Sequence, residues 1–395
     1  MVAYSFYETD SRIIQYARSL RRRGDSVDVI ALARVGAPRT EVIDGVHVYR
    51  IQQRKINERT AFSYLFRIIR FLLLAMVTIT WRHARNRYQV VHVHSVPDFL
   101  VIAALPLRLM GVPVILDIHD ILPEFYASKF GTDQDSVVYR ALVVLERWSA
   151  RLTSHVIIAN HLWYDRLVKR SVPKEKCSVI CNYPNPDMFY LQPQRNCSGR
   201  FLLMYPGSLN WHQGVDIAIR AFAQVSSQID TAEFHIYGEG SARPSLEKLV
   251  EELGLQQKVQ IQDYRPTDEI AKLMAMADLA VVPKRASSNF GNEAASTKIQ
   301  EFMAVGVPVI VSRTRIDSLY FDESMVRFFE SENVNSLAAA IIELYMHPEQ
   351  RRKLVDGANR HIQQNNWDVK QYEYLNIINS LTVRPTTGPT HATAT

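Results

Sequence analysis

Two glutamates frame the segment NFGNEAASTKIQE, which runs from residue 289 to residue 301. Glu293 follows a Phe-Gly-Asn sequence typical of a turn, and Glu301 opens the apolar run FMAVGVPVIV. A helix starting near 294–296 would offer phosphate its free N–H groups and the positive end of its dipole. The residues between the glutamates are small enough for a bulky anion to approach: Ala294, Ala295, Ser296 and Thr297. Since carboxylates accept bonds from hydroxyls, the segment fits a nucleotide sugar, which has hydroxyls at both ends and phosphates between them.

A plainer interpretation of the same segment stays open. Glu293 could cap the helix, and Glu301 could pair with Lys298 three residues earlier. Because two glutamates at this spacing often occur by accident, the spacing alone favours an ordinary solvated helix over a ligand site.

Short apolar runs alternate with helical patterns along the chain, as in parallel sheets covered by helices. The first set of expected strands is 2–7, 27–32, 46–51, 90–95, 114–119 and 155–160. The pattern restarts with 201–208, 233–240, 258–264, 279–284, 307–312 and 326–330. Helical patterns lie between them, as at 11–24, where Gly24 is a C-cap candidate. Because 395 residues exceed one hydrophobic core, we predict two α/β domains joined by the proline-containing segment 182–200.

Ligands of open α/β sheets bind beyond the carboxyl ends of the strands, so the residues there are the candidate site. In the first domain His119 ends an expected strand and Asp120 follows it. The second domain contributes, besides the opening segment, the strand-end residues Gly207, Ser208, Gly238, Tyr264, Arg265, Lys284 and Arg285.

The basic character of the chain belongs to its first quarter. Residues 1–100 hold sixteen Lys and Arg but eight Asp and Glu, although the whole chain has a net charge of only +6. Such a surface attracts nucleic acid, phospholipid headgroups or diphosphates. The unbroken apolar stretch within segment 61–81 is too short to span a membrane, and arginines flank the segment. It therefore favours a helix lying on an anionic membrane through 54–87, or a helix packed on a sheet, and not nucleic-acid binding.

Several chemistries are disfavoured by missing motifs. No G-x-G-x-x-G follows the first strand, where residues 7–12 read YETDSR, and no Walker A or G-x-S-x-G sequence occurs. Histidines and cysteines show no metal-ligand spacing, so we expect neither a metal nor a cofactor. Cys177, Cys181 and Cys197 cannot all pair, and a reducing, cytoplasmic compartment fits best.

The residues also resemble a known family. FGNE followed by STKIQEFMAVGVPVIVS resembles the E-x7-E signature of family-four retaining glycosyltransferases of the GT-B fold. In the family's order, similar segments are QVVHVHS, VILDIHD, KCSVICNYPNPDMF, MYPGSLNWHQGVDIAIRAF, EFHIYGEGSARPSLEKLVEELGL and MADLAVVP. The resemblance covers nearly the whole chain, and it reverses the preference for the plain helix.

The resemblance implies two Rossmann-like domains that face each other across a cleft, 1–188 on the acceptor side and 189–365 on the nucleotide-sugar side. A helix at 366–382 would cross back to the first domain, followed by a disordered tail at 383–395. Glu293 would contact the transferred sugar, and Glu301 the ribose. The diphosphate would be held by Ser296 and Thr297, with Tyr264 and Arg265 near the base and His119 near the sugar.

One departure concerns the phosphate clamp. Where the family often has Arg and Lys in G-R-L-x-x-x-K-G, this chain reads GSLNWHQG, with Ser208 and Gln213. A leaving diphosphate needs positive charge, and the candidates are Lys284, Arg285, Lys298 and His212.

These observations predict a retaining, metal-independent glycosyltransferase of polysaccharide biosynthesis, peripheral on the cytoplasmic side of the membrane. It would move a sugar from a UDP- or GDP-sugar to a glycan or lipid-linked acceptor. Two alternatives stay open, a nucleotide-sugar epimerase of the same fold and a degenerate, non-catalytic module that binds sugar nucleotides.

Overall fold

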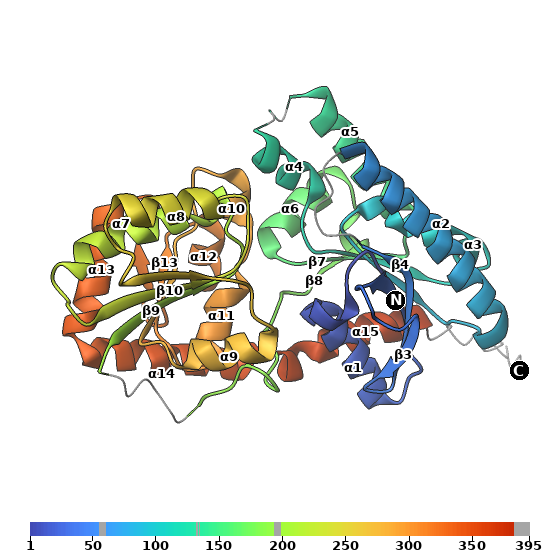
Figure 1. Cartoon of the computed structure of the whole chain (residues 1–395). Helices are drawn as coiled ribbons and strands as arrows, with labels where there is room; N and C mark the ends of the chain where they lie inside the picture. Colours follow the sequence, from blue (N-terminus) through green and yellow to red (C-terminus); the bar gives the residue numbers. More distant parts are fainter. Residues whose placement is uncertain (55–60, 132, 134, 193–198, 383–395) are drawn as a thin grey trace, which may run out of the picture.

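The computed structural model describes the chain except for residues 55–60, 132, 134, 193–198 and 383–395. The predicted tail at 383–395 and part of the predicted membrane segment therefore lie outside the described residues. The described chain forms two α/β lobes, the first on the right and the second on the left of Figure 1.

The first domain is built on an eight-stranded sheet in the order β3-β4-β2-β1-β5-β6-β7-β8. Its strands are β1 (Val2–Ala3), β2 (Asp28–Ala33), β3 (Thr40–Ile43), β4 (Val46–Gln53), β5 (Val91–His94), β6 (Val114–Ile118), β7 (His155–Ile158) and β8 (Cys177–Val179). Its helices are α1 (Ser11–Arg23), α2 (Ala61–Asn86), α3 (Leu105–Leu109), α4 (Leu122–Phe130), α5 (Val137–Arg151) and α6 (His161–Arg170). Short 3₁₀ segments are η1 (Tyr7–Thr9), η2 (Asp98–Ala104) and η3 (Lys174–Lys176).

The second domain has a six-stranded sheet in the order β11-β10-β9-β12-β13-β14, and all its strand pairs are parallel. The strands are β9 (Phe201–Pro206), β10 (Ala232–Tyr237), β11 (Val259–Gln262), β12 (Leu279–Val282), β13 (Val309–Ser312) and β14 (Arg327–Phe329). The helical segments are η4 (Trp211–Gln213), α7 (Val215–Ser226), α8 (Arg243–Glu252), α9 (Thr267–Ala275), α10 (Asn289–Glu293), α11 (Thr297–Ala304), α12 (Arg315–Tyr320), α13 (Val334–Met346) and α14 (Pro348–Gln364).

Both faces of each sheet are covered, which explains why the strands read as continuous apolar runs. In β9, Leu203 and Tyr205 pack into one hydrophobic layer, and Met204 packs into the layer on the opposite face. The prediction of two α/β domains with parallel sheets is confirmed. The predicted C-cap is also confirmed, because Gly24 ends α1 with a φ of 99°.

Three local predictions differ from the structure. The first strand stops at Ala3 instead of continuing to residue 7, and η1 follows it. The unpredicted strand β3 pairs antiparallel with β4 through a turn at Asp44 and Gly45, whose φ angles are 50° and 76°. The Phe-Gly-Asn segment forms the short helix α10 rather than a turn, so the helix expected near 294–296 begins only at Thr297.

The last described helix, α15 (Trp367–Thr382), packs on α1 of the first domain, as the red helix under the right-hand lobe of Figure 1 shows. Trp367 Nε1 donates to Ser19 Oγ at 2.9 Å, and Tyr374 OH lies 3.1 Å from His92 Nδ1. The chain therefore returns to the first domain after completing the second.

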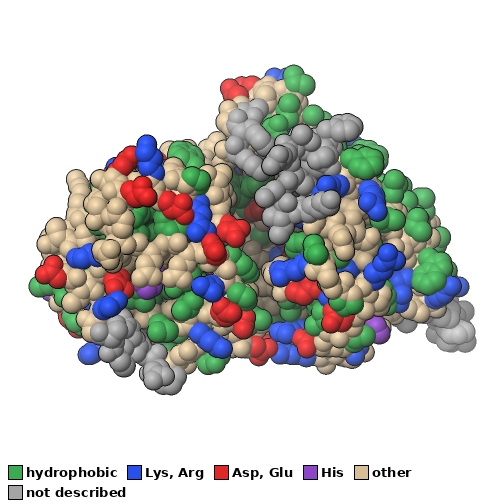
Figure 2. Space-filling model, viewed as in Figure 1, with side chains coloured by type: hydrophobic (Ala, Val, Ile, Leu, Met, Phe, Trp, Pro, Cys, Tyr) green, Lys and Arg blue, Asp and Glu red, His purple; other side chains and the backbone are tan. Residues whose placement is uncertain are grey.

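Helix α2 has two apolar faces. One face packs into the core of the first domain through Ile68, Phe71, Leu72, Ala75 and Ile79. The other is a stripe at helical spacing that solvent reaches: Phe66, Ile69, Leu73, Val77 and Trp81. Figure 2 shows hydrophobic side chains beside Lys and Arg on this right-hand edge of the molecule. Among the described residues, no helix has the length and hydrophobicity that crossing a membrane requires. The interpretation as a packed helix holds for one face, and membrane contact through the other stays a prediction.

Candidate functional site

A pocket of about 190 Å³ opens at the carboxyl edge of the second sheet. In this sheet β9 lies between β10 and β12. At such a point the connections to the two neighbouring strands run in opposite directions, and ligands of open α/β sheets bind there. The predicted site residues that line it are Gly207, Tyr264, Arg265, Thr297, Lys298 and Glu301. Sequence positions almost a hundred residues apart are thus brought to one pocket.

Lys298 lies directly over the backbone of Gly207. A Cβ atom at residue 207 would fall 2.2 Å from Lys298 Cε, so this approach requires glycine. Among the described residues, Lys298 Nζ has no hydrogen-bond or ion-pair partner, and it lies 5.4 Å from the centre of the Tyr205 ring. Burial lowers the pKa of Lys298 to about 8, Glu301 opposes this shift, and Lys284 adds to it. An unpaired ammonium group at the first turn of α11 is suited to a phosphate ligand.

Glu301 also lines the pocket, and burial raises the pKa of its carboxyl group. It forms no ion pair with Lys298 within 4.0 Å, so the plain interpretation of an i−3 pair between these two described residues is not observed. The N-cap of α11 is Ser296, without a side-chain cap bond, so Glu293 does not cap this helix either.

Lys284 is buried and does not line the pocket. Its Nζ donates to Ala294 O at 2.7 Å and pairs with Asp317 Oδ2 at 2.8 Å. Because Ala294 precedes α11 by only a few residues, Lys284 fixes the chain that leads into the helix start. Its charge also acts on Lys298 and His212, lowering the pKa of each.

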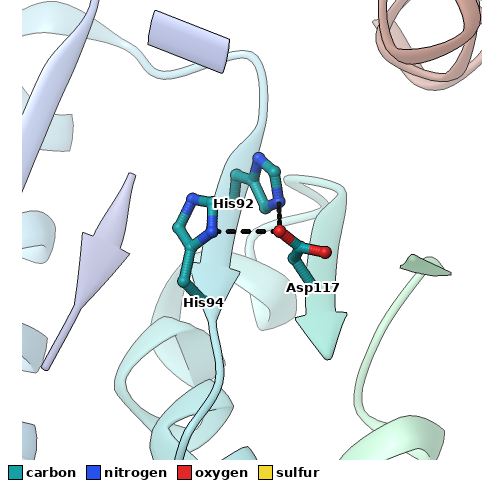
Figure 3. Close-up of side chains that lie close together, drawn as sticks. All are labelled: His92, His94 and Asp117. Carbon is teal, nitrogen blue, oxygen red and sulfur yellow. Dashed lines mark hydrogen bonds and ion pairs between the residues drawn. The ribbon is translucent and has the colours of Figure 1, made fainter. Parts of the chain in front are cut away.

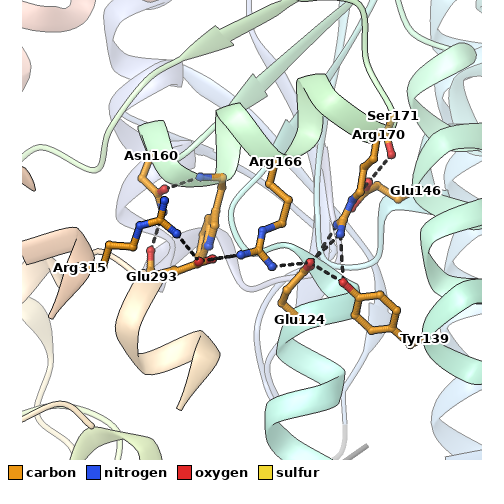
Figure 4. A network of polar contacts seen from close by, with 10 residues as sticks. Glu124, Tyr139, Glu146, Asn160, Arg166, Arg170, Ser171, Glu293 and Arg315 are labelled. Atoms are coloured by element: carbon orange, nitrogen blue, oxygen red, sulfur yellow. Dashed lines mark hydrogen bonds and ion pairs between the residues drawn. The ribbon is translucent and has the colours of Figure 1, made fainter. Parts of the chain in front are cut away.

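Glu293 ends α10 and points at the first domain. Both of its carboxylate oxygens accept from Arg166 Nη2, at 2.6 Å and 2.7 Å, and Arg315 Nη1 lies 3.4 Å from Oε1 (Figure 4). Its side chain is only 9% exposed. Glu293 therefore lies at the contact between the two domains, outside the lining of the pocket that holds Glu301.

His119 belongs to a buried group at the carboxyl end of β5 and β6. Its Nε2 lies 3.1 Å from Asp117 Oδ2 and 3.3 Å from His94 Nδ1. Burial alone would lower the pKa of His119, but the charge of Asp117 and its hydrogen bond outweigh burial and raise it. Arg12 binds both Asp117 oxygens, at 2.8 Å and 2.7 Å, and holds the pKa of that carboxyl far below its usual range against the opposing effect of burial.

His92, His94 and Asp117 come close enough to form a potential metal-binding group, which the sequence did not predict (Figure 3). One ligand atom from each lies within 4.8 Å of the others. However, the guanidinium of Arg12 already binds both Asp117 oxygens, so a cation there would meet a fixed positive charge. The chemistry of this group fits a buried ion pair that orients His119 better than it fits a metal centre.

Comparison with known families decides what these domains are. Residues 191–361 match the model described as glycosyl transferases group 1, and residues 10–183 match the glycosyl transferase 4-like domain. Together the two models cover nearly all of both domains. The chain belongs to the GT-B glycosyltransferases.

Relatives and solved structures agree with this assignment. An uncharacterised glycosyltransferase of Methanocaldococcus jannaschii is 26% identical over 75% of this chain and 74% of its own. A phosphatidylinositol N-acetylglucosaminyltransferase subunit of Schizosaccharomyces pombe is 24% identical over 86% and 70%. Sucrose-phosphate synthase from Thermosynechococcus elongatus superposes with a TM-score of 0.77 at 18% identity, over 96% of this chain and 98% of that one. HepE of Anabaena, in a complex with UDP-glucose, has a TM-score of 0.70 at 16% identity, with 96% and 98% covered.

The remaining predicted residues of this glycosyltransferase lie around the pocket or beyond it. Gly238 meets the backbone of Gly207, because a Cβ atom there would fall 1.9 Å from Gly207 O. The side chain of Ser208 is exposed, whereas Ser296 Oγ is buried and has no partner among the described residues. Arg285 is not brought to the pocket: it pairs with Asp216 at 2.6 Å and lines a different groove, between α7 and α8.

Gln213, at a clamp position, and His212, a candidate for the positive charge, take other roles. Gln213 Oε1 accepts from Tyr205 OH at 3.2 Å, so this side chain stabilises the loop that follows β9. Burial, with Lys298 and Lys284, lowers the pKa of His212 to about 4, which leaves this histidine neutral at pH 7. Of the four basic candidates in this glycosyltransferase, Lys298 is the one that lines the pocket.

Sequence reasoning missed the residues that hold the predicted ones in place. Arg166 and Arg12 belong to no motif, and Asp117 was included only as part of the segment VILDIHD, without a role; their partners lie 127, 105 and 105 positions away. The available signal was weak: Asp117 is a charged residue inside the apolar strand VILDI, where an acid must find a partner.

Proposed function

We propose that this glycosyltransferase moves a sugar from a UDP- or GDP-sugar to a glycan or lipid-linked acceptor in polysaccharide biosynthesis, with retention of configuration. The observation that carries the proposal is the pocket at the carboxyl edge of the second sheet, where Lys298, Glu301 and the start of α11 meet. The UDP-glucose bound in HepE supports a uridine donor.

The nucleoside part of the donor would lie against Tyr264 and Arg265, and Glu301 would accept from the ribose hydroxyls. The diphosphate would meet Lys298 and the free N–H groups at the first turn of α11. Lys298 thus supplies, from α11, the charge that the family's usual Arg and Lys supply from the loop after β9. This arrangement supports a metal-independent reaction, in which a lysine and a helix dipole stabilise the leaving diphosphate.

The transferred sugar would lie between the domains, with Glu293 and His119 at its hydroxyls. The imidazole of His119 is held by Asp117, and its raised pKa favours a cationic ring near the leaving oxygens. Substrate positioning and diphosphate stabilisation, rather than a cofactor, would carry catalysis.

The surface of the first domain supports the proposal of a lipid-linked acceptor. A groove lies between the β2–β4 edge and α2, and it is lined in part by Arg39, Arg67 and Arg70. Beside it runs the exposed stripe of α2. A basic groove next to an apolar stripe suits an acceptor with a phosphate head and a lipid tail on an anionic cytoplasmic membrane face. The relative named as a phosphatidylinositol N-acetylglucosaminyltransferase subunit supports a lipid acceptor.

A binding and turnover series tests this function. Thermal shift with UDP, GDP, UDP-glucose and GDP-mannose should show stabilisation by at least one nucleotide, because a ligand of the folded state raises the melting temperature. NMR of the products should then show sugar transfer or slow donor hydrolysis with retained anomeric configuration, unaffected by EDTA. An altered sugar still attached to the nucleotide would instead identify an epimerase. Tight binding without any turnover would identify the non-catalytic module, and wild-type rates in Glu293→Ala and His119→Ala would remove both residues from the mechanism.

A further inference from the structure

Helix α10 belongs to the second domain by sequence but packs against the first. Phe290 lies in the same hydrophobic cluster as Trp163, and its ring centre is 5.3 Å from that of Phe125. Ser128 Oγ and Ser288 Oγ are 3.1 Å apart. The residue at the end of this helix is Glu293, whose own carbonyl oxygen accepts from Asn160 Nδ2 at 3.1 Å. The backbone of Glu293 is therefore held by the first domain.

The side chain of Glu293 is held by the first domain as well. Arg166, on α6, gives one nitrogen, Nη2, to both carboxylate oxygens. Its other terminal nitrogen, Nη1, donates to Glu124 Oε1 at 3.0 Å. Figure 4 shows Arg166 between the two glutamates, one from each domain. Arg166 thus bridges the two glutamates, and each of its terminal nitrogens makes charged hydrogen bonds to one of them.

The first-domain end of this bridge is rigid. Glu124 is 2% exposed, and it also accepts from Tyr139 OH at 2.7 Å and from Arg170. Arg170 in turn pairs with Glu146. Because Glu124 is buried and held by several donors, it fixes the plane of the Arg166 guanidinium, and that plane fixes Glu293.

We propose that Arg166 is a positioning residue for donor-sugar recognition across the domain interface. A carboxylate has about four lone-pair sites, and Arg166 uses two of them on Glu293. Arg315 Nη1 occupies a third site on Oε1 through the longer contact of 3.4 Å. The remaining site can accept from a sugar hydroxyl in a direction that Arg166 sets. Glu293 is then oriented to bind the sugar only while the two domains are in contact. This inference rests on the proposed function, because it assigns the sugar moiety of the donor to Glu293.

A purely structural contact between the domains would predict a different outcome. In that case any interdomain contact of α6 would be equivalent. The chain offers a matched comparison, since Tyr320 OH, at the end of α12, contacts both His161 N and His161 Nδ1 at the start of α6, at 3.0 Å and 2.9 Å. Tyr320→Phe removes this contact without touching Glu293.

The test compares how tightly each variant binds a nucleotide with and without its sugar. Isothermal titration with UDP and UDP-glucose, or with GDP and GDP-mannose if the base is guanine, gives the ratio of the two dissociation constants. Arg166→Ala should change the dissociation constant of the nucleoside diphosphate by no more than about twofold. It should raise the dissociation constant of the sugar nucleotide by about 10-fold, the effect of losing a charged hydrogen bond. Arg166→Lys should restore part of the ratio. Arg315→Ala, which removes the longer contact, should have a smaller effect.

Each outcome decides the inference. Tyr320→Phe should lower the melting temperature yet keep the wild-type ratio of dissociation constants. A wild-type ratio in Arg166→Ala, with a lowered melting temperature, would overturn the positioning role and leave the proposed function intact. A wild-type chain that binds none of the four nucleotides would overturn the proposed function, and this inference with it.

Discussion

Lys298 Cε lies 2.2 Å from the place that a Cβ atom of residue 207 would occupy. The glycine after β9 and the lysine at the start of α11 are therefore a matched pair, because this position of the lysine side chain leaves no room for a side chain at residue 207. This pair lies beside the loop that contains Ser208 and Gln213, where the family resemblance predicts a basic clamp.

Gly207→Ala should weaken nucleotide binding without unfolding the protein. The added methyl group must displace the flexible end of Lys298, and Gly207 has a φ of 139°, a value that alanine rarely adopts. We expect the dissociation constant of UDP or GDP to rise by about 10-fold. Gly254→Ala is the matched control, because Gly254 also has a positive φ, of 67°, but no atom lies within 4 Å of the position that its new methyl group would take. Equal losses in the two variants would contradict the role of Lys298.

Lys298→Met should stabilise the free protein while weakening the binding of a nucleoside diphosphate. The pKa of Lys298 in the folded chain is about 8, below its ordinary value of 10.5, so folding is penalised while this lysine is charged. The unfolded chain holds more protons between these two values, so wild-type stability should rise with pH across this window. At pH 7 the variant should be more stable by about 1–3 kcal/mol, and the difference should fade above pH 8.

The binding side of this prediction is measured by titrating UDP or GDP between pH 6 and pH 9.5. Wild-type affinity should weaken as the pH rises through about 8, because Lys298 loses its charge. In Lys298→Met the affinity should already be about 10- to 100-fold weaker and should lack this step. Ionisation of the base affects both proteins alike, so parallel pH curves would exclude Lys298 as the clamp.

Asp117→Asn should destabilise the first domain strongly. The variant leaves the buried Arg12 without its carboxylate, a change that typically costs about 3–5 kcal/mol, measured here by urea unfolding. In the folded variant the pKa of His119 should fall, because the charge that raises it is gone, and ¹⁵N-histidine NMR would follow this titration. Asp120→Asn is the control: it removes a neighbouring carboxylate but keeps the Arg12 pair. An unchanged His119 titration in Asp117→Asn would show that Asp117 does not set its charge.

Val77→Glu with Trp81→Glu should reduce binding to anionic vesicles. Both side chains belong to the exposed stripe of α2, at 69% and 53% exposure, so the folded state should be little affected. Co-sedimentation with vesicles containing phosphatidylserine should drop by about 10-fold or more, since apolar insertion and charge attraction are both reduced. Met346→Glu, at 65% exposure on the second domain, should bind like the wild type. Vesicle binding that persists in the double variant would place the membrane contact elsewhere.

Among the basic residues near α2, Arg70, Arg85 and Arg87 are exposed, whereas Arg82 is not available for lipid. Arg82 pairs with Asp28 at 2.9 Å and stacks on Tyr49. A charge-removal series should therefore change the first three to Ser and omit Arg82. Their combined loss should make vesicle binding weak even at low salt, where charge attraction is least screened.

The repeating strands and helices could be predicted from the sequence because each strand is covered on both faces and so reads as an apolar run. The edge strand β3 was missed although Asp44-Gly45 is a strong hairpin signal, since its four residues TEVI are largely exposed and do not form an apolar run. The pocket was predicted in part, because Gly207, Lys298 and Glu301 follow strands or open a helix. Arg285 looked equivalent to Lys284 in sequence, but the two neighbours point to different partners, Asp216 and Asp317.

The Arg166–Glu293 contact could not be predicted from spacing. Arg166 lies on an ordinary amphipathic helix, and nothing in its neighbours distinguishes it from Lys169 or Arg170. What selects it is the packing of α10 onto the first domain, a tertiary arrangement that depends on Phe290 meeting Trp163 and Phe125.

The packing of α15 on α1 has a consequence for biosynthesis. Trp367, Tyr374 and Ile378 belong to the hydrophobic core that also contains Tyr16, Val29 and Ile115. Proteins emerge from the ribosome from the N-terminus, and early domains usually fold first. Here the first domain to be made lacks part of its interior until residue 378 has been translated, so the second domain can finish folding before the first.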